Sequence, residues 1–404
     1  MSQHESSRVA LATEVFGNPA ALFTALGSRS PLHRVTLPDG QAAVMVTGNR
    51  EAREALNDPR LVRSIEAAAP ELRMFHPLAH DEYKMPQHML FADPPNHARL
   101  RRLVSKAFTR PRVKEMRARV QEITDELIDV IAPKGSADLV PTLTQPLSVA
   151  VISEMLGVPA QDRAEFAHHA TLMTGINAFS DFAAVIAANQ WLDASLTELA
   201  ARRRVEPADD LLSAMVAAQV DDDQLTDLEV KSNALLLLIA GFETTMNLIA
   251  NGIVALLTHP EALAALRADP SLMPNAVDEM LRYDPPGSTV TYYYAAERTE
   301  IAGFAIEPGE QVVISVAAAN HDPAVFTDPS RFDIHRNTGQ MLSFSHGIHF
   351  CLGAPLARLE AEVAFTTVLR RLPDLALAVP VQELTWNQSY HLHRMDALPV
   401  TFTV

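Results

Sequence analysis

Cys351 is the only cysteine among the 404 residues of this chain, and its thiol could serve in several kinds of chemistry. It lies in the segment Phe-Ser-His-Gly-Ile-His-Phe-Cys-Leu-Gly, residues 344–353, just before a predicted helix that carries Pro355 in its first turn. The free amides and the dipole of a helix N-terminus favour a thiolate over a thiol. Gly347 and Gly353 permit a tight loop that a flat group can approach closely. A thiolate held in this way could attack a substrate or ligate a metal.

The chain leaves three roles open for this cysteine. A nucleophile needs a general base, and His349 is near in sequence, but their spacing in an irregular loop does not ensure that the two side chains meet. A metal centre must draw its other ligands from elsewhere, because a single cysteine excludes multi-cysteine zinc and iron–sulfur sites. Haem iron, with four porphyrin nitrogens and one thiolate, meets that requirement. The third role is that of a small buried apolar residue.

A second group of polar residues interrupts a strongly apolar segment. Residues 240–245 read Ala-Gly-Phe-Glu-Thr-Thr in the middle of a helix predicted over Ser232 to Leu257. An acid, two hydroxyls and a glycine are costly inside such a helix. The simplest explanation is that Thr244 bonds back to the carbonyl of Ala240 while Glu243 pairs with a distant cation.

The elements that must position these residues are mostly helical. Apolar residues recur at helical spacing from Pro94 to about Arg267, and further helices are predicted at 274–283 and 355–372. Strand-like runs are found at 42–47, 288–294, 311–316 and 398–404. No linker rich in Gly or Ser divides the chain, so residues 1–404 are predicted to form a single domain, mainly α with a small β portion.

Charge and composition exclude several classes of partner. The net charge is −16, which repels nucleic-acid phosphates. The N-terminal residues have no basic segment followed by an apolar one, and the longest strongly apolar run, Ala234 to Phe242, is too short to cross a bilayer. We therefore expect a cytoplasmic protein with no nucleic-acid or membrane partner, and a monomer.

The cysteine segment resembles the ligand loop of bacterial cytochromes P450, Phe-Gly-x-Gly-x-His-x-Cys-Leu-Gly. The matching residues are Phe344, Gly347, His349, Cys351, Leu352 and Gly353, and Ser345 stands where the family usually has Gly. The resemblance, of the soluble, class I, actinobacterial type, implies the P450 fold, with haem b between a long central helix and this loop. It implies that Cys351 is the axial thiolate and that Phe344, Ser345, His349 and Gly353 border the porphyrin.

Two other motifs resemble the same family. Residues 240–245 are similar to its central-helix motif, which implies that Ala240 and Gly241 border the haem. It also implies that Thr244 positions protons at bound dioxygen and that Glu243 helps to deliver them. The spacing of Glu279 and Arg282 resembles the family's structural Glu-x-x-Arg pair, whose third partner here would be Arg336, with Arg331 a weaker candidate.

The residues expected to hold the haem propionates match the family only in part. Asp93-Pro94-Pro95-Asn96-His97 and the following Arg101 resemble its Asp-Pro-Pro-x-His-x-x-x-Arg segment, which implies that His97 and Arg101 bind the propionates. Tyr293, however, occupies the position of a usual Arg, and Met341 that of a common His. We therefore expect the propionates to be held differently here, and the sequence leaves open whether the Tyr293 hydroxyl substitutes.

The resemblance also suggests redox partners. From Arg99 to Arg119 there are nine basic residues and one acid, Glu115, in an otherwise acidic chain. In the family this segment lies near the proximal surface, where it would attract an acidic ferredoxin. The chain has no residues left for a flavin or nicotinamide domain, so ferredoxin and ferredoxin reductase would supply the electrons.

The substrate pocket, by the same resemblance, would be formed by residues 85–91, 172–182, 237–244, 287–291 and 389–391. The candidate contacts are Met89, Leu90, Leu237, Thr291 and Tyr390. We predict a monooxygenase that hydroxylates or epoxidises a hydrophobic natural product resembling a macrolide, terpenoid or steroid. The alternatives are a P450 that performs oxidative coupling or desaturation, a haem-based sensor, and a colourless cysteine-dependent hydrolase or transferase.

Overall fold

The computed structural model of the chain describes residues 8–11, 19–73, 88–174, 182–220, 223–387 and 389–404. These residues form two compact units. The first comprises Met1–Ala79, Asn251–Cys351 and Pro380–Asp396; the second comprises His80–Ala250, Leu352–Val379 and Ala397–Val404. That residues 1–404 form a single domain stays a prediction.

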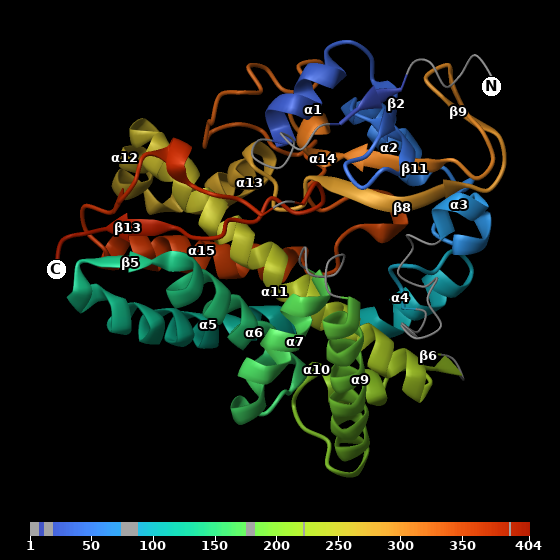
Figure 1. Ribbon diagram of the computed structural model, residues 1–404. Coiled ribbons are helices and arrows are strands. Elements are labelled where there is room, and N and C mark those ends of the chain that lie inside the picture. Colours follow the sequence, from blue (N-terminus) through green and yellow to red (C-terminus); the bar gives the residue numbers. More distant parts are fainter. Residues whose placement is uncertain (1–7, 12–18, 74–87, 175–181, 221–222, 388) are drawn as a thin grey trace. The chain divides into compact units, whose positions relative to one another are not determined.

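The first unit is built on a six-stranded sheet with the order β1-β2-β3-β11-β8-β4. Its strands are β1 (Val9–Ala10), β2 (Leu32–Thr36), β3 (Ala42–Val46), β4 (Leu61–Val62), β8 (Thr289–Ala295) and β11 (Gln311–Ser315). Strand β11 pairs parallel with β3 and antiparallel with β8, its neighbour in Figure 1. The strands predicted at 42–47, 288–294 and 311–316 agree with β3, β8 and β11 to within one residue at each end.

Both faces of this sheet are covered. Along β3, Val44 and Val46 belong to one apolar cluster while Ala43 and Met45 belong to another, as the alternation of side chains along a strand requires. The remaining elements of the unit are α1 (Pro19–Gly27), α2 (Asn49–Asn57), α3 (Pro70–Arg73), α12 (Pro260–Ala268), α13 (Met273–Tyr283), α14 (Val316–Ala319), β9 (Thr299–Ile301) and β10 (Phe304–Ile306).

The second unit is mostly helical. Its helices are α4 (Asn96–Ala107), α5 (Arg110–Ile131), α6 (Gln145–Leu156), α7 (Arg163–Thr174), α9 (Phe182–Val205), α10 (Leu211–Val216), α11 (Asp227–Thr258, which enters the first unit at Asn251) and α15 (Ala354–Arg371). Its short strands are β5 (Ser136–Asp138), β6 (Gln219–Val220), β7 (Asp223–Gln224), β12 (Ala376–Leu377) and β13 (Pro399–Thr401). The strand predicted over 398–404 is therefore shorter than expected, and it pairs with β5 and β12.

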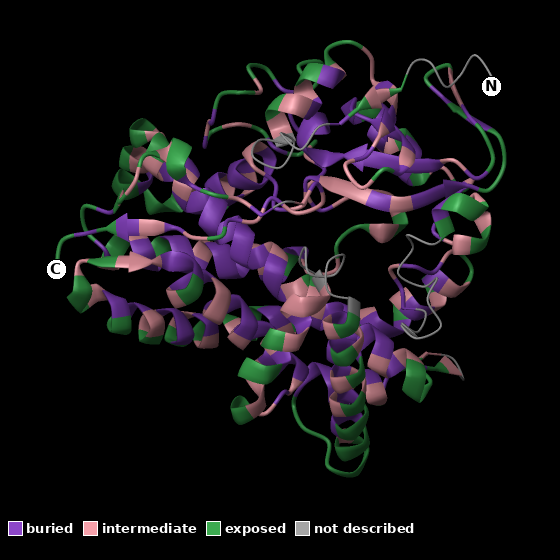
Figure 2. Cartoon of the chain, in the orientation of Figure 1, coloured by how far each residue is buried: buried purple, intermediate pink, exposed green. Residues whose placement is uncertain are grey.

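Helix α11 is longer than its apolar pattern predicted, because it begins at Asp227 rather than Ser232. Thr226 and Glu229 explain the earlier start: the Glu229 amide donates to Thr226 Oγ1 and the Thr226 amide donates to the Glu229 carboxylate, a capping box. By length and composition α11 could also cross a membrane, but 78% of its most apolar stretch is buried, a property shared by core helices. Figure 2 shows this burial along much of the helix.

Candidate active site

The loop that carries Cys351 is held by its own backbone. The Cys351 amide donates to the Phe344 carbonyl at 2.9 Å, and the Ser345 amide donates to the Leu342 carbonyl at 2.8 Å. Cys351 is exposed, and helix α15 begins close after it at Ala354, with Gly353 as the N-cap and Pro355 in the first turn. This placement before a helix N-terminus favours the thiolate.

Two residues of this loop adopt the left-handed conformation. Gly347 has a φ of 71°, and a Cβ there would lie 2.7 Å from Asn57 Oδ1 and 2.8 Å from the Leu56 carbonyl. Ser345 has a φ of 63°, which explains why the family usually has Gly at that position. The glycine pattern of the motif is therefore a backbone requirement, and Ser345 meets it at a cost.

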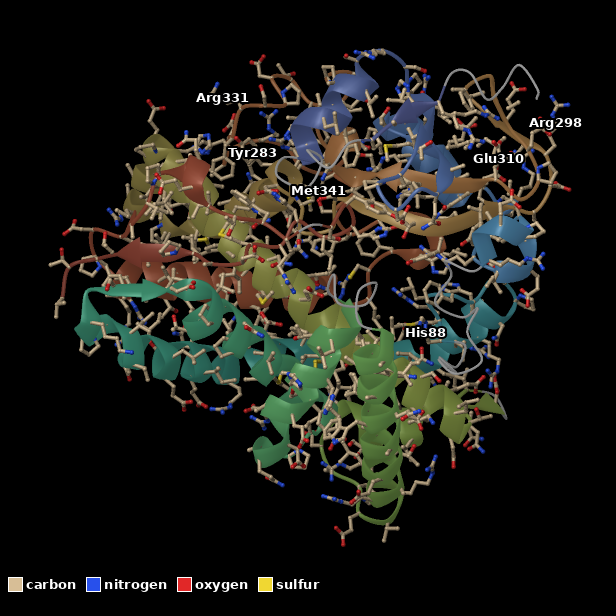
Figure 3. The ribbon with its side chains drawn as sticks, viewed as in Figure 1. His88, Tyr283, Arg298, Glu310, Arg331 and Met341 are labelled. Carbon is tan, nitrogen blue, oxygen red and sulfur yellow. The ribbon has the colours of Figure 1, made fainter. Side chains whose placement is uncertain are left out.

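His346 ties the loop to α2. Its Nδ1 lies 3.2 Å from Arg53 Nη1, and Arg53 Nη2 donates to the Gln340 carbonyl at 2.8 Å. Burial and the nearby guanidinium lower the pKa of His346, so a neutral imidazole accepts this hydrogen bond. Met341 (Figure 3), at the position of the family's common His, lies in the same segment and donates its amide to the Thr338 carbonyl.

A buried ion cluster forms around Glu279 in the same unit, and Arg336, not Arg331, is its second cation. The Glu279 carboxylate accepts from Arg282 Nε at 2.7 Å, from Arg336 Nε at 3.2 Å and from the Asp333 amide at 2.9 Å. The side chains of Glu279 and Arg282 are fully buried. Arg331 contributes its backbone carbonyl, which accepts hydrogen bonds from Arg282 and Arg336. Figure 3 labels Arg331 and, in the same region, Tyr283.

Asn320 and Ser343 connect this cluster to the cysteine loop, and the sequence prediction missed both. Arg282 donates to the Asn320 carbonyl at 3.0 Å, while the Asn320 side chain accepts from the Leu342 amide and donates to Ser343 Oγ. Ser343 Oγ in turn donates to the Leu281 carbonyl at 2.7 Å. In the sequence Asn320 directly follows three alanines, and the structure shows that it is buried, where a polar side chain needs partners.

In the second unit, Thr244 is placed as the simplest explanation expected, since its Oγ1 donates to the Ala240 carbonyl at 2.9 Å. Glu243 is 2% exposed, and its pairing with a distant cation stays a prediction. A Cβ on Gly241 would lie 2.7 Å from Ile152 Cγ1. Gly241 therefore allows α6 to approach α11 closely, a role that the motif alone did not indicate.

Helix α4 carries the other expected haem contacts. His97 is buried in its first turn, and Arg101 is partly exposed one turn later. Arg99, between them, faces elsewhere and pairs with Glu229 at 2.6 Å and Asp223 at 2.9 Å. This arrangement agrees with helical spacing: residues four apart, such as His97 and Arg101, lie on one side of a helix, and Arg99 lies on another.

The substrate-contact candidates fall into three groups. Met89 and Leu237 are buried, Leu90 is half-buried, and the Met89 amide donates to Asn233 Oδ1 at 3.2 Å. Thr291 is buried on β8. Tyr390 packs in the core of the first unit and donates its hydroxyl to Asp39 at 2.8 Å, which gives it a structural role. Residues 85–87 and 175–181 lie outside the described residues.

In the basic segment 99–119, nearby acidic side chains neutralise much of the positive charge that the composition suggested. Several of its arginines form ion pairs within the second unit, at 2.6–3.0 Å: Arg99 with Glu229, Arg112 with Asp209, Arg117 with Glu362 and Arg119 with Glu154. Arg110 and Lys114 remain exposed on α5. Any attraction of an acidic partner would therefore depend on the exposed cations.

The donor set fits a haem better than a bare metal ion. Within the described ranges, no three His, Cys, Asp or Glu side chains gather in positions for a metal, so Cys351 would be a single protein ligand. A porphyrin supplies the remaining equatorial ligands. The buried hydroxyl of Tyr293, near the cysteine loop, has no hydrogen-bond partner among the described residues, which is consistent with a polar group of a ligand binding there.

The comparisons with known proteins agree with this arrangement. The family model described as "Cytochrome P450" matches residues 37–204 and 183–373. The cytochrome P450 monooxygenase PikC of Streptomyces venezuelae is 43% identical over 395 residues, which cover 97% of this chain and 92% of PikC. The 6-deoxyerythronolide B hydroxylase of Saccharopolyspora erythraea is 44% identical over 368 residues, 89% of this chain and 90% of the hydroxylase.

A solved structure extends the match to three dimensions. The Bacillus subtilis cytochrome P450 PksS, of the bacillaene polyketide synthase, superposes with a TM-score of 0.91 at 32% identity, covering 97% of this chain and 98% of PksS. The predicted P450 fold is therefore confirmed. The chain belongs to the cytochrome P450 family, as a bacterial monooxygenase of that class.

Proposed function

We propose that this chain is a haem-thiolate enzyme in which the Cys351 thiolate would ligate the haem iron and that it hydroxylates or epoxidises a hydrophobic natural product. Members of the family carry haem with a cysteine thiolate ligand, use dioxygen and need redox partners. When bound, the haem supplies dioxygen activation, which the thiolate assists by donating electron density. The observation that carries the assignment is the exposed Cys351 in a fixed loop before α15.

The protein's own residues would then divide the work. His97, Arg101 and His349 would bind haem carboxylates or border the ring, because cationic and N–H donors suit carboxylates. Glu243 and Thr244 would hold and transfer the protons that the reaction consumes, and in this structure the Thr244 hydroxyl donates to the Ala240 carbonyl. The Glu279 cluster would keep the cysteine loop in place through Asn320 and Ser343.

For the substrate, we propose a polyketide-type molecule of macrolide size. The relatives include one named for hydroxylation of 6-deoxyerythronolide B and one that belongs to a bacillaene polyketide synthase. Buried apolar side chains such as Met89 and Leu237 would suit such a ligand. Incubation with macrolactones, followed by mass spectrometry under labelled dioxygen, identifies the product and separates oxygen insertion from coupling or desaturation.

We also propose that electrons come from a ferredoxin and its reductase, in a cytoplasmic and monomeric enzyme. The exposed cations Arg110 and Lys114 on α5 would attract the acidic partner. Turnover with ferredoxin is then expected to fall as salt is added, since exposed charges are screened over about 10 Å at 0.1 M salt. A flat response to salt would remove this steering role.

The decisive experiment is the spectrum of the reduced protein under carbon monoxide. The wild-type protein is expected to show the thiolate-type band, and Cys351→Ala is expected to lose it. A colourless wild-type protein, or a Cys351→Ala variant that keeps the band, would contradict the proposed function. Thr244→Ala then tests the proton role: we expect reductant use to continue while product formation falls roughly tenfold or more.

A further inference from the structure

Strand β8 has a bulge next to the cysteine loop. In its pairing with β11, Val312 is opposite Tyr293 and Ile314 is opposite Val290, so two residues of β8, Thr291 and Tyr292, face one residue of β11. Tyr292 has a φ of 62°, an uncommon conformation for a bulky residue. A bulge redirects side chains and frees backbone groups from the ladder. Here the Thr291 carbonyl accepts a hydrogen bond from Arg63 Nη1 at 3.2 Å.

Arg63 is a buried cation beside this bulge. It follows β4, which pairs with β8 through Leu61 and Val62, and it is only 3% exposed. Its guanidinium carbon lies 4.2 Å from the centre of the Tyr293 ring. The stacking and the hydrogen bond to Thr291 together fix the plane of the guanidinium, and a fixed plane allows bidentate binding of a carboxylate.

Tyr293 extends this group towards the cysteine loop. Its ring centre is 6.3 Å from that of His349, which lies two residues before Cys351. Its hydroxyl is buried and has no hydrogen-bond partner in the part of the chain that the structure describes. A buried hydroxyl without a partner is unfavourable, so it indicates a group that binds there.

We propose that Arg63 and Tyr293 together bind one carboxylate of the haem, with the Arg63 guanidinium as the cation and the Tyr293 hydroxyl as an additional donor. The inference rests on the proposed function, because the ligand is the haem of Cys351. The sequence has Tyr293 where the family usually has an arginine. In this proposal Arg63, directly after the neighbouring strand β4, supplies the cation instead, and its guanidinium stacks on the Tyr293 ring.

The test compares haem loss from the intact haem protein to an excess of a haem-scavenging apoprotein. Arg63→Met keeps the length of the side chain and removes the charge, so haem loss is expected to accelerate roughly tenfold or more. Arg34→Met is the matched control, because the Arg34 guanidinium also stacks on a ring of the first unit, Phe304 at 4.9 Å, but it pairs with Glu310 (Figure 3). Its rate should stay within about twofold of wild type.

Tyr293→Phe separates ligand binding from a structural role. It removes only a hydroxyl that lacks a partner, so the haem-free protein should unfold at the same or a higher temperature, whereas the loaded protein should lose haem several-fold faster. A hydroxyl with a purely structural role would lower the stability of both forms. In the double variant Arg63→Met/Tyr293→Arg, a cation is restored at position 293, and slow haem loss should return.

The outcomes distinguish this inference from the proposed function. If wild type and Arg34→Met show the thiolate-type band and Arg63→Met loses haem at the wild-type rate, the carboxylate site is refuted while the haem-thiolate function stands. If wild type shows no such band, the function itself fails. An Arg63→Met protein that does not fold is replaced by Tyr293→Phe, whose unchanged rate of haem loss would equally refute the site.

Discussion

Two buried glutamates show how differently the two units accommodate a buried acid. Glu279 of the first unit is fully buried and accepts hydrogen bonds from Arg282, Arg336 and the Asp333 amide. Glu360, on α15 of the second unit, is 1% exposed, and its Oε2 has no partner among the described residues. Burial raises the pKa of Glu360 well above its usual range, so this acid is accommodated by protonation rather than by pairing.

The difference follows from the backbone around each acid. The interior of a regular helix uses its amides within the helix, so α15 can offer Glu360 no donors of its own. The irregular segment 327–336 has free amides and carbonyls, and it brings them to Glu279 and its two arginines. The cysteine loop of the same unit is irregular too, and its residues Ser345 and Gly347 adopt the left-handed conformation. The acid of the first unit is therefore paired by an irregular backbone, and the acid of the second unit lies in a regular helix without a pair.

The largest expected effect comes from breaking the paired acid. Arg282→Ala removes the main partner of Glu279 and leaves a buried charge, which costs about 3–5 kcal/mol. The Asn320 and Ser343 contacts that hold the cysteine loop should be lost with it. We expect the variant to be unable to incorporate haem, as measured by the Soret absorbance per protein and by urea unfolding.

The control for this variant is Arg298→Ala. Arg298, labelled in Figure 3, pairs with Glu307 at 3.5 Å, and both side chains are more than half exposed. Such a pair is worth about 0–1 kcal/mol, so haem content should stay normal. Normal haem uptake by Arg282→Ala would show that the Glu279 cluster does not support the cysteine loop.

The next effect tests the strained backbone. Gly347→Ala must hold a Cβ in the left-handed conformation and against Asn57 Oδ1 at 2.7 Å, so we expect a loss of about 2–4 kcal/mol. Gly40→Ala is its control, because Gly40 has a φ of 87° with nothing within 4 Å of an added Cβ. That variant should cost only the conformational part, about 1–2 kcal/mol. Equal losses in the two variants, measured by urea unfolding, would deny the contact with α2.

The sequence could predict this region only in part. The Phe344–Gly353 pattern and the spacing of Glu279 and Arg282 are local, so they indicated the loop and its ion pair directly. Asn320 and Ser343 act through contacts between segments 22 or more residues apart, which no local pattern encodes. The same holds for Arg63 and Tyr293, whose contact depends on the pairing of β4 with β8.

For Glu360 the local sequence pattern is misleading. Its position at helical spacing in an amphipathic segment is typical of an exposed acid, and only the packing of α15 shows that it is buried. The domain organisation has a similar origin: the chain has no flexible linker, yet its contacts divide it into two units. The long-range pairing that produces these units cannot be deduced from composition.

Glu360→Gln should have an effect that depends on pH. Because the folded protein holds the Glu360 proton more tightly than the unfolded chain, wild-type stability is complete below the ordinary pKa of 4.5 and declines as the pH rises towards the folded value. Each unit of that difference is worth about 1.4 kcal/mol. The glutamine variant lacks this decline, so its thermal midpoint should gain on wild type as the pH rises above the ordinary pKa of 4.5.

Glu362→Gln, on the same helix, is the control for the pH series. Its carboxylate pairs with Arg117 at 2.7 Å, so we expect a small loss of stability without a gain over wild type at high pH. If Glu360→Gln behaved like Glu362→Gln across the series, then Glu360 would have to be paired in the folded protein, and the contrast with Glu279 would disappear.

The smallest effect, Ser345→Gly, relieves the strain that the cysteine loop carries. A left-handed serine costs about 1–2 kcal/mol relative to glycine, and part of this gain is offset because glycine gives the unfolded chain more freedom. We therefore expect a net stabilisation of about 0.5–1 kcal/mol in urea unfolding, with the thiolate-type band unchanged. Ser345→Ala keeps the Cβ but removes the buried hydroxyl, which has no partner among the described residues. If alanine stabilised the protein as much as glycine, the cost would lie in that hydroxyl rather than in the backbone.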